Sequence, residues 1–427
     1  MAPKKTTKDD VVPAFPWRVD PKTDKPKAPP KAAQTRLTEI RKKLQKDHKG
    51  VIVRPARDSA PPWVLFRRPT GLPSLDQACG GGFPPGGTTQ IIGAPSIGKT
   101  TLVLTHLGLH QRIHGEDSRI FLAMTEGELD KDYARKLGFY IALNDDELEA
   151  KEVKFGRKLT DDERREYTYE VGHIELLKAG EKGYTPELQD AVVDLVLTGE
   201  FQTGLIDSLG AAANEDQIEK PSAARHPGGG SARTNTQFSS KLARAFLLEH
   251  EEGRMNETTV IMINQLRQDI GSNKKFMGSR VPAKHSGGYA LLHGHLLNLE
   301  LWKGPFAKLK KKVDGKDVEI KVGYTVYWEI AKGKCSCHEG IRGSYVYHYA
   351  NKRSPFPVGP DLCLDAVQQG LGTTVSDTGH PKFTDSKGEV HKANSVQNLA
   401  TKLDLNGLYW DIYHANAKAL DFRTRLK

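Results

Sequence analysis

The 427-residue chain is predicted to be an α/β protein whose core is a mostly parallel sheet. Four short apolar runs have the composition of buried strands: Gln90–Ile92, Ile120–Leu122, Gly204–Ser208 and Val260–Gln265. Helix-favouring residues follow the first run, and a helix is predicted at Val192–Val196 before the third. Because strands alternate with helices, we expect the strands to run parallel, with polar residues at their carboxyl ends.

The first run leads into a loop with the glycine spacing and Lys-Thr ending of a phosphate-binding P-loop. Two glycines let the backbone curl so that its N–H groups converge on a phosphate at the start of a helix. A chance glycine-rich turn is the alternative, but the strand before and the helix after favour nucleotide binding. The predicted binding residues are Gly93, Ala94, Pro95, Ser96, Ile97, Gly98, Lys99, Thr100 and Thr101.

Composition narrows the class of protein without identifying it. A net charge of +10 fits a polyanionic partner and a lysine-rich solvated surface equally well. Four cysteines are too few for a disulfide framework, and the Cys335–His338 cluster lacks the second ligand pair of a closed zinc site. The low cysteine count favours a reducing compartment. Because no apolar run approaches the length of a membrane span, we expect a soluble protein with no membrane partner.

The N-terminal region divides into two predicted parts. Residues 1–34 are rich in lysine and proline, with little to bury, and predict a disordered basic tail. From Arg36 to Lys49, apolar residues recur at helical spacing, and Val51–Val53 predicts a strand. So short an apolar stripe needs a surface elsewhere to pack against.

Three blocks around the P-loop carry a specific family resemblance. Thr70–Ala78 and Gly80–Gly86 approach its strand, and Glu126–Gly138 follows the second strand. These blocks resemble the RecA family of recombinases, which includes bacterial RecA and its phage relatives of the UvsX type. The resemblance implies an N-terminal oligomerisation helix and strand at 35–60, which would dock on a neighbouring subunit, a RecA-like ATPase core at 61–355 and a small α+β C-terminal domain at 356–427.

The strand Gly204–Ser208 ends in a carboxylate, Asp207, downstream of a P-loop, which predicts a Walker B strand. Asp207 would hold Mg²⁺ through water and Thr100 would bind it directly, with ATP as the nucleotide. The resemblance implies that Glu126 polarises the attacking water, although Glu128 is a rival assignment.

Further roles in the nucleotide site follow from the resemblance alone. Asp130 and Tyr133 match the family residues that hold and stack on adenine. Gln265 matches the residue that senses the γ-phosphate and signals to a DNA-binding loop. Lys332 and Lys334 match a lysine pair that reaches a neighbouring subunit's γ-phosphate, as arginine fingers do; an ordinary basic turn is the alternative.

Two stretches correspond to the family's DNA-binding loops. The first, Asn214 to about Thr236, contains Arg233, which matches a DNA-contacting arginine; a plain surface loop is the alternative. The second runs from Leu266 to about His285, where cations can neutralise phosphates and apolar side chains can stack on bases. Its predicted contacts, with the closing glycines, are Arg267, Ile270, Lys274, Lys275, Phe276, Arg280, Lys284, Gly287 and Gly288. Tyr289 replaces the family's usual asparagine.

One segment has no family counterpart. Residues from about 144 to 170 are dense in charge, and Asp161–Glu166 is typical of an exposed helix, so a surface insertion is predicted. Its role is open.

The resemblance implies a DNA-dependent ATPase that forms helical filaments on single-stranded DNA. It would catalyse homologous pairing and strand exchange in recombination and repair. Expected partners are single-stranded DNA, homologous duplex DNA, further copies of the chain, a single-strand-binding protein and loading mediators. The expected location is the cytoplasm, at the nucleoid or in a phage-infected cell. Two alternatives stay open: a ring ATPase that drives translocation or acts on protein partners, and a non-hydrolysing recombination mediator.

Overall fold

The computed structural model describes residues 31–47, 61–125, 127–178, 185–209, 230–248, 255–268, 283–285, 294–313, 316–335, 337–348, 373–375, 379–385, 387–395, 398–399 and 402–403. The chain divides into two compact units, Met1–Ala60 and Pro61–Lys427. No helix among the described residues has the length and apolar character needed to cross a bilayer.

The described part of the first unit is helix α1 (Lys31–Asp47). It begins earlier than the sequence pattern suggested, inside the range 1–34 that was expected to be disordered. The physical reason is local, because Lys31, Ala32, Ala33 and Gln34 are all good helix formers. The strand predicted at Val51–Val53 lies outside the described residues.

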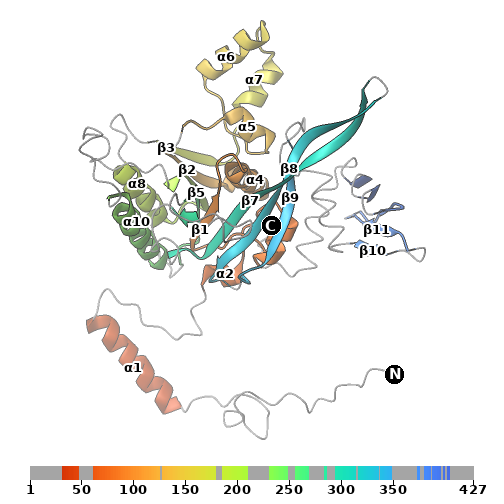
Figure 1. Cartoon of the computed structure of the whole chain (residues 1–427). Helices are drawn as coiled ribbons and strands as arrows, with labels where there is room; N and C mark the ends of the chain where they lie inside the picture. Colours follow the sequence, from red (N-terminus) through yellow and green to blue (C-terminus); the bar gives the residue numbers. More distant parts are fainter. Residues whose placement is uncertain are drawn as a thin grey trace, which may run out of the picture. The chain divides into compact units, whose positions relative to one another are not determined.

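The second unit is built on a large sheet with strand order β3-β2-β4-β5-β1-β7-β8-β9, and β6 pairs with an extension of β5 (Figure 1). Neighbouring strands from β3 to β7 run parallel, whereas β8 and β9 add antiparallel. This confirms the predicted α/β class and its mostly parallel sheet. The strands are β1 (Gly87–Gly93), β2 (Arg119–Met124), β3 (His173–Lys178), β4 (Thr203–Asp207), β5 (Thr259–Gln268), β6 (Ala283–His285), β7 (Leu297–Val313), β8 (Lys316–Gly333) and β9 (Arg342–His348).

Helices cover both faces of the parallel region (Figure 1). Alternate residues of β5 show this: Ile261 and Ile263 pack with α4, whereas Val260 and Met262 pack with α8 and α10. A strand buried on both faces is continuously apolar, which is why it was recognisable in the sequence. The helices are α2 (Pro62–Leu65), α3 (Pro73–Ala78), α4 (Lys99–His114), α5 (Lys131–Lys136), α6 (Asp145–Phe155), α7 (Asp161–Thr168), α8 (Thr185–Thr198) and α10 (Gly230–Leu247), with a 3₁₀ turn, η4 (Gly115–Asp117).

The charged segment at 144–170 contains the two helices α6 and α7, each begun by a capping box. Leu143, Leu148 and Leu159 form a small core of their own. The segment is tied to α5, because the Arg135 guanidinium donates to the carbonyl oxygens of Ile141, Glu166, Tyr167 and Tyr169. The charge pattern that predicted an exposed helix corresponds to α7, which has no buried residue.

The described C-terminal residues include a three-stranded antiparallel sheet of β10 (Thr373–Val375), β11 (Pro381–Thr384) and β12 (Val390–Lys392). Asp385 closes the turn after β11, because one carboxylate oxygen accepts from the Lys387 and Glu389 amides and the other contacts His391 Nε2. Whether residues 356–427 form a separate domain stays a prediction.

Gly108 on α4 tests how closely this helix approaches the chain that follows α5. A Cβ at position 108 would lie 2.6 Å from the Gly138 carbonyl carbon. Helix propensity alone would make Gly108→Ala stabilising by about 1 kcal/mol. We expect the backbone clash to outweigh this, lowering the free energy of unfolding by about 1–3 kcal/mol in urea denaturation. Gly294→Ala, whose nearest contact would be 3.7 Å from Ser239 Cβ, is the control; a stabilised Gly108→Ala protein would contradict the close approach.

Candidate nucleotide-binding site

The P-loop joins the end of β1 to the start of α4. Gly98 has a φ of 96°, in the left-handed region, and a Cβ there would lie 3.3 Å from the Tyr347 ring. Both facts favour glycine at this position. The helix N-terminus that follows presents backbone N–H groups to the loop, as anion sites do. Lys99 is buried, and its ammonium donates to the carbonyl oxygens of Gly93 (3.0 Å) and Ala94 (2.8 Å). The lysine is thus already directed along the loop that would hold phosphate.

Thr100 and Asp207 meet although 107 positions separate them in sequence. The Thr100 hydroxyl donates to Asp207 Oδ2 at 2.8 Å. A hydroxyl and a carboxylate side by side form an oxygen donor set that suits Mg²⁺, which prefers few protein ligands and several waters. These two residues could therefore hold the metal.

A further contact, which the sequence did not predict, fixes the position of the chain at the end of β4. Thr125 follows β2, and its hydroxyl accepts from the Ser208 amide (2.8 Å) and donates to the Ser208 carbonyl (2.7 Å). This pair of bonds ties the ends of β2 and β4 together, next to Asp207. Threonine follows many strands, so no sequence signal marked Thr125.

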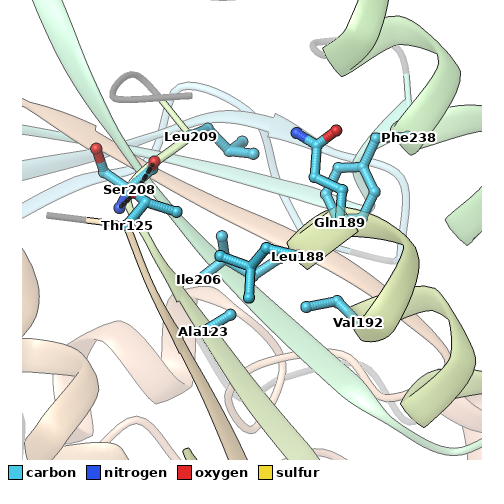
Figure 2. Close-up of a pocket in the computed structure, with 9 residues that line it drawn as sticks. All are labelled: Ala123, Thr125, Leu188, Gln189, Val192, Ile206, Ser208, Leu209 and Phe238. Atoms are coloured by element: carbon cyan, nitrogen blue, oxygen red, sulfur yellow. Dashed lines mark hydrogen bonds between the residues drawn. The ribbon is translucent and has the colours of Figure 1, made fainter. Parts of the chain in front are cut away.

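Behind this contact lies a small, mostly apolar pocket between the sheet and helices α8 and α10 (Figure 2). Figure 2 shows Thr125 and Ser208 close together on the strand side and Gln189 and Phe238 on the helix side. Gln189 donates to Asn235 at 2.9 Å, so the two helices are joined by a buried amide pair. The lining residues are Ala123, Thr125, Leu188, Gln189, Val192, Ile206, Ser208, Leu209 and Phe238.

A cleft of about 600 Å³ opens over the P-loop, within the usual size of ligand sites. It brings together eleven residues predicted from sequence: Pro95, Ser96, Ile97, Gly98, Lys99, Thr100, Thr101, Asp130, Tyr133, Asp207 and Gln265. Its other lining residues are Leu104, Met124, Glu128, Leu129, Ile263 and Tyr347. Of these, Glu128 was considered in the sequence analysis, as the rival to Glu126.

Tyrosines from distant segments form one wall of the cleft. The Tyr133 hydroxyl lies 2.5 Å from Thr101 Oγ1 and 3.4 Å from the Tyr347 hydroxyl. Tyr347 stacks on Tyr324, with ring centroids 5.0 Å apart, and the Tyr324 hydroxyl donates to the Ser96 carbonyl. Burial raises the pKa of Tyr133, so its phenol stays protonated at neutral pH. The wall can stack on a planar base.

The acidic residues of the 126–130 block differ in their surroundings. Asp130 caps α5, and its carboxylate accepts from the Tyr133 amide at 2.9 Å. Glu128 is exposed and pairs with Lys178 at 2.7 Å, and this hydrogen bond and charge lower the Glu128 pKa. Glu126 lies outside the described residues, so its assignment as the water-polarising carboxylate stays a prediction.

Lys332 lies near the C-terminal end of β8 and Lys334 just after it, at the edge of the sheet opposite to the P-loop. Gly93, where the P-loop begins, pairs with Leu301, whereas Lys332 pairs with Asn298. From the spacings of β-sheets, Lys332 is roughly 10 Å from Gly93 along the strands and roughly 10 Å across them. Neither lysine is among the described residues that line the cleft.

The predicted DNA contacts lie mostly beyond the described residues. Arg233 lies in the first turn of α10, which begins at Gly230, so the loop expected to extend to about Thr236 ends earlier. Arg267 on β5 and Lys284 on β6 are antiparallel partners in register. The remaining predicted contacts lie outside the described residues: Ile270, Lys274, Lys275, Phe276, Arg280, Gly287 and Gly288.

Substitution of Lys99 tests the phosphate end of the cleft. We expect Lys99→Ala to weaken binding of Mg²⁺ with a nonhydrolysable ATP analogue roughly 10- to 100-fold, because a charged hydrogen bond to phosphate is lost. Isothermal titration calorimetry measures this directly. The control is Lys241→Ala, which removes an exposed ion pair with Asp190 and should bind normally. Equal affinities of Lys99→Ala and the unchanged protein would contradict a phosphate site here.

Comparison with known proteins is consistent with this site. No protein-family model matches the chain. Protein RecA of Nitratidesulfovibrio vulgaris (strain DP4) is 31% identical over 255 residues, covering 60% of this chain and 58% of that protein. Protein RecA of Leifsonia xyli is 32% identical over 262 residues, covering 61% and 58%, and that of Campylobacter jejuni (strain 81-176) is 31% identical over 254 residues, covering 59% and 60%.

The chain thus spans about three-fifths of the length of the curated relatives it matches. It is similar to RecA proteins, and its α/β core has the RecA-like fold of P-loop ATPases.

Proposed function

We propose that this protein is a DNA-dependent ATPase that assembles on single-stranded DNA as a helical filament and carries out homologous pairing and strand exchange. The observation that carries the proposal is the continuity of β5. Gln265 lines the nucleotide cleft and pairs with Gly93 at the start of the P-loop. The same strand continues into the segment 266–285, predicted to bind DNA.

In this mechanism, ATP occupies the cleft with its phosphates against the P-loop and Lys99. Thr100 and Asp207 would hold Mg²⁺, which would supply positive charge to offset that of the phosphates. Glu126 polarises the attacking water. Gln265 contacts the γ-phosphate and favours the DNA-binding conformation of the 266–285 segment while ATP is intact. Hydrolysis removes that contact and returns the subunit to a weaker-binding state.

The DNA surface combines cations with apolar side chains. Arg267 and Lys284 are cross-strand partners on the β5–β6 hairpin, so both belong to the base of the same loop. Cations neutralise phosphates, while Ile270 and Phe276 contact bases, which holds a single strand with little sequence preference. Arg233 contributes from the first turn of α10. The partners are single-stranded DNA, homologous duplex DNA and further copies of the chain, aided by a single-strand-binding protein and loading mediators, in the cytoplasm.

Lys332 and Lys334 act on a neighbouring subunit's nucleotide. Their distance from the chain's own P-loop supports this, because a cation must lie beside the γ-phosphate to stabilise its transition state. Hydrolysis then requires two subunits in contact, which couples ATP turnover to assembly.

The first test measures ATP hydrolysis with and without single-stranded DNA over a salt series. We expect strong stimulation by DNA that weakens as salt rises, because bound cations release counterions from the strand. Lys99→Ala should abolish it. Electron microscopy with DNA and a nonhydrolysable analogue should show filaments. Hydrolysis indifferent to DNA, with closed rings in the micrographs, would instead support a ring ATPase acting on other partners.

The second test separates the two halves of the shared site. Lys332→Ala should bind ATP normally yet lose at least about 100-fold in DNA-stimulated hydrolysis. In an equal mixture of Lys99→Ala and Lys332→Ala proteins, roughly a quarter of interfaces would combine an intact P-loop with an intact lysine. Hydrolysis should therefore partly recover on mixing. Normal hydrolysis by Lys332→Ala alone would remove the assignment in trans.

A further inference from the structure

The end of β8 contains a bulge that changes which residue faces β7. Leu299 pairs with Ile330, but the next residue, Asn298, pairs with Lys332. Ala331 is the extra residue, and in a regular ladder it would face Asn298 in place of the lysine. Bulges re-aim side chains in this way and are frequent beside functional sites. The strand irregularity therefore brings Lys332, specifically, opposite Asn298.

Asn298 is a buried amide whose oxygen is unused within the described structure. Asn298 is 2% exposed, and its Oδ1 has no hydrogen-bond partner among the described residues. At the same level of the sheet, Gln90 on β1 pairs with Asn298 and is fully buried, and neither atom of its amide has a partner in the part of the chain that the structure describes. Buried amides without partners are costly, and each one calls for an explanation. Gln90, Asn298 and Lys332 thus form a polar row across three adjacent strands.

The surroundings of Lys332 disfavour its protonated form, so a hydrogen-bond acceptor beside the ammonium would help to keep it charged. Burial, and then the charge of Lys334, lower the Lys332 pKa to about 8, while Glu339 opposes the shift. His295, just before β7, is buried with a pKa lowered to about 3, so it adds no charge at neutral pH. A hydrogen bond accepted by a neutral amide favours the charged form of a lysine without adding a competing negative charge.

We propose that Asn298 is a positioning residue for Lys332 in the assembled filament: the Asn298 amide oxygen, which has no partner among the described residues of the single chain, then accepts a hydrogen bond from the Lys332 ammonium and holds it, protonated, at the subunit boundary. Gln90, the in-register residue on the next strand, would donate to the same oxygen in that state, because an amide oxygen has two lone pairs. This inference rests on the proposed role of Lys332 in trans. It gives Asn298 a role in hydrolysis although Asn298 would touch neither nucleotide nor DNA.

The test compares Asn298→Leu, which keeps the volume and removes the acceptor, with Asn298→Asp, which keeps an acceptor and adds charge. DNA-stimulated ATP hydrolysis is measured from pH 6.5 to 9.5 on the full chain. We expect Asn298→Leu to lower kcat roughly tenfold with little change in KM, because only the cation in trans is affected. The fall in rate at alkaline pH should move to lower pH in Asn298→Leu and to higher pH in Asn298→Asp.

Two comparisons make the result decisive. Glu319→Gln, on an exposed part of β8, should leave the pH profile unchanged. Lys332→Ala is measured in parallel: if it is impaired while both Asn298 variants keep the original profile, the positioning role of Asn298 is overturned and the proposed function stands. If Lys332→Ala hydrolyses ATP normally, the role in trans fails, and this inference with it. Should Asn298→Leu fail to fold, the shift in Asn298→Asp decides the question.

Discussion

The register between β1 and β5 is the constraint on which the candidate site depends. Gly93 pairs with Gln265, so the start of the P-loop and the end of β5 meet at one edge of the sheet. Both strands are buried on both faces, and a slip of one residue would move every side chain to the wrong face. The same packing requirement sets β4 beside β5, which brings Asp207 to Thr100. The packing of the buried strands thereby also brings together the two residues that could hold the metal.

β7 pairs parallel with β1 but antiparallel with β8, and β8 contributes residues to two separate regions. Near the middle of this strand, the Tyr324 hydroxyl donates to the Ser96 carbonyl in the chain's own P-loop. Near the C-terminal end of the strand lies Lys332, eight residues later and roughly 26 Å away at the rise of a β-strand. A single rigid strand therefore connects the chain's own nucleotide cleft with the lysine proposed to serve a neighbour. The insertion that contains α6 and α7 is attached to α5 through Arg135, and the same helix carries Tyr133 of the cleft.

Local patterns predicted the parts of the site that are contiguous in sequence. The P-loop combines a strand, a glycine-bounded loop and a helix start within a dozen residues, so its composition reports its geometry. Asp207 was predicted because it ends a continuous apolar run, whereas the role given to Gln265 came from the family resemblance. Tyr347 was missed because an aromatic residue on a strand carries no motif, and its approach to Gly98 depends on how β9 packs. The start of α1 was misjudged because an apolar stripe marks where a helix packs, and polar helix formers such as Lys31 precede it.

The sequence by itself determined the α/β class, the phosphate loop and the polar residues that end the central strands, because these follow from short-range periodicity and backbone conformation. Only the tertiary structure decided that Thr125 ties β2 to β4, that tyrosines from α5 and β9 line one wall with Tyr324 of β8 stacked on it, and that a bulge sets Lys332 opposite Asn298. The physical reason is that these contacts depend on strand order and register. Both are set by burial over the whole sheet and leave no trace in any single stretch of residues.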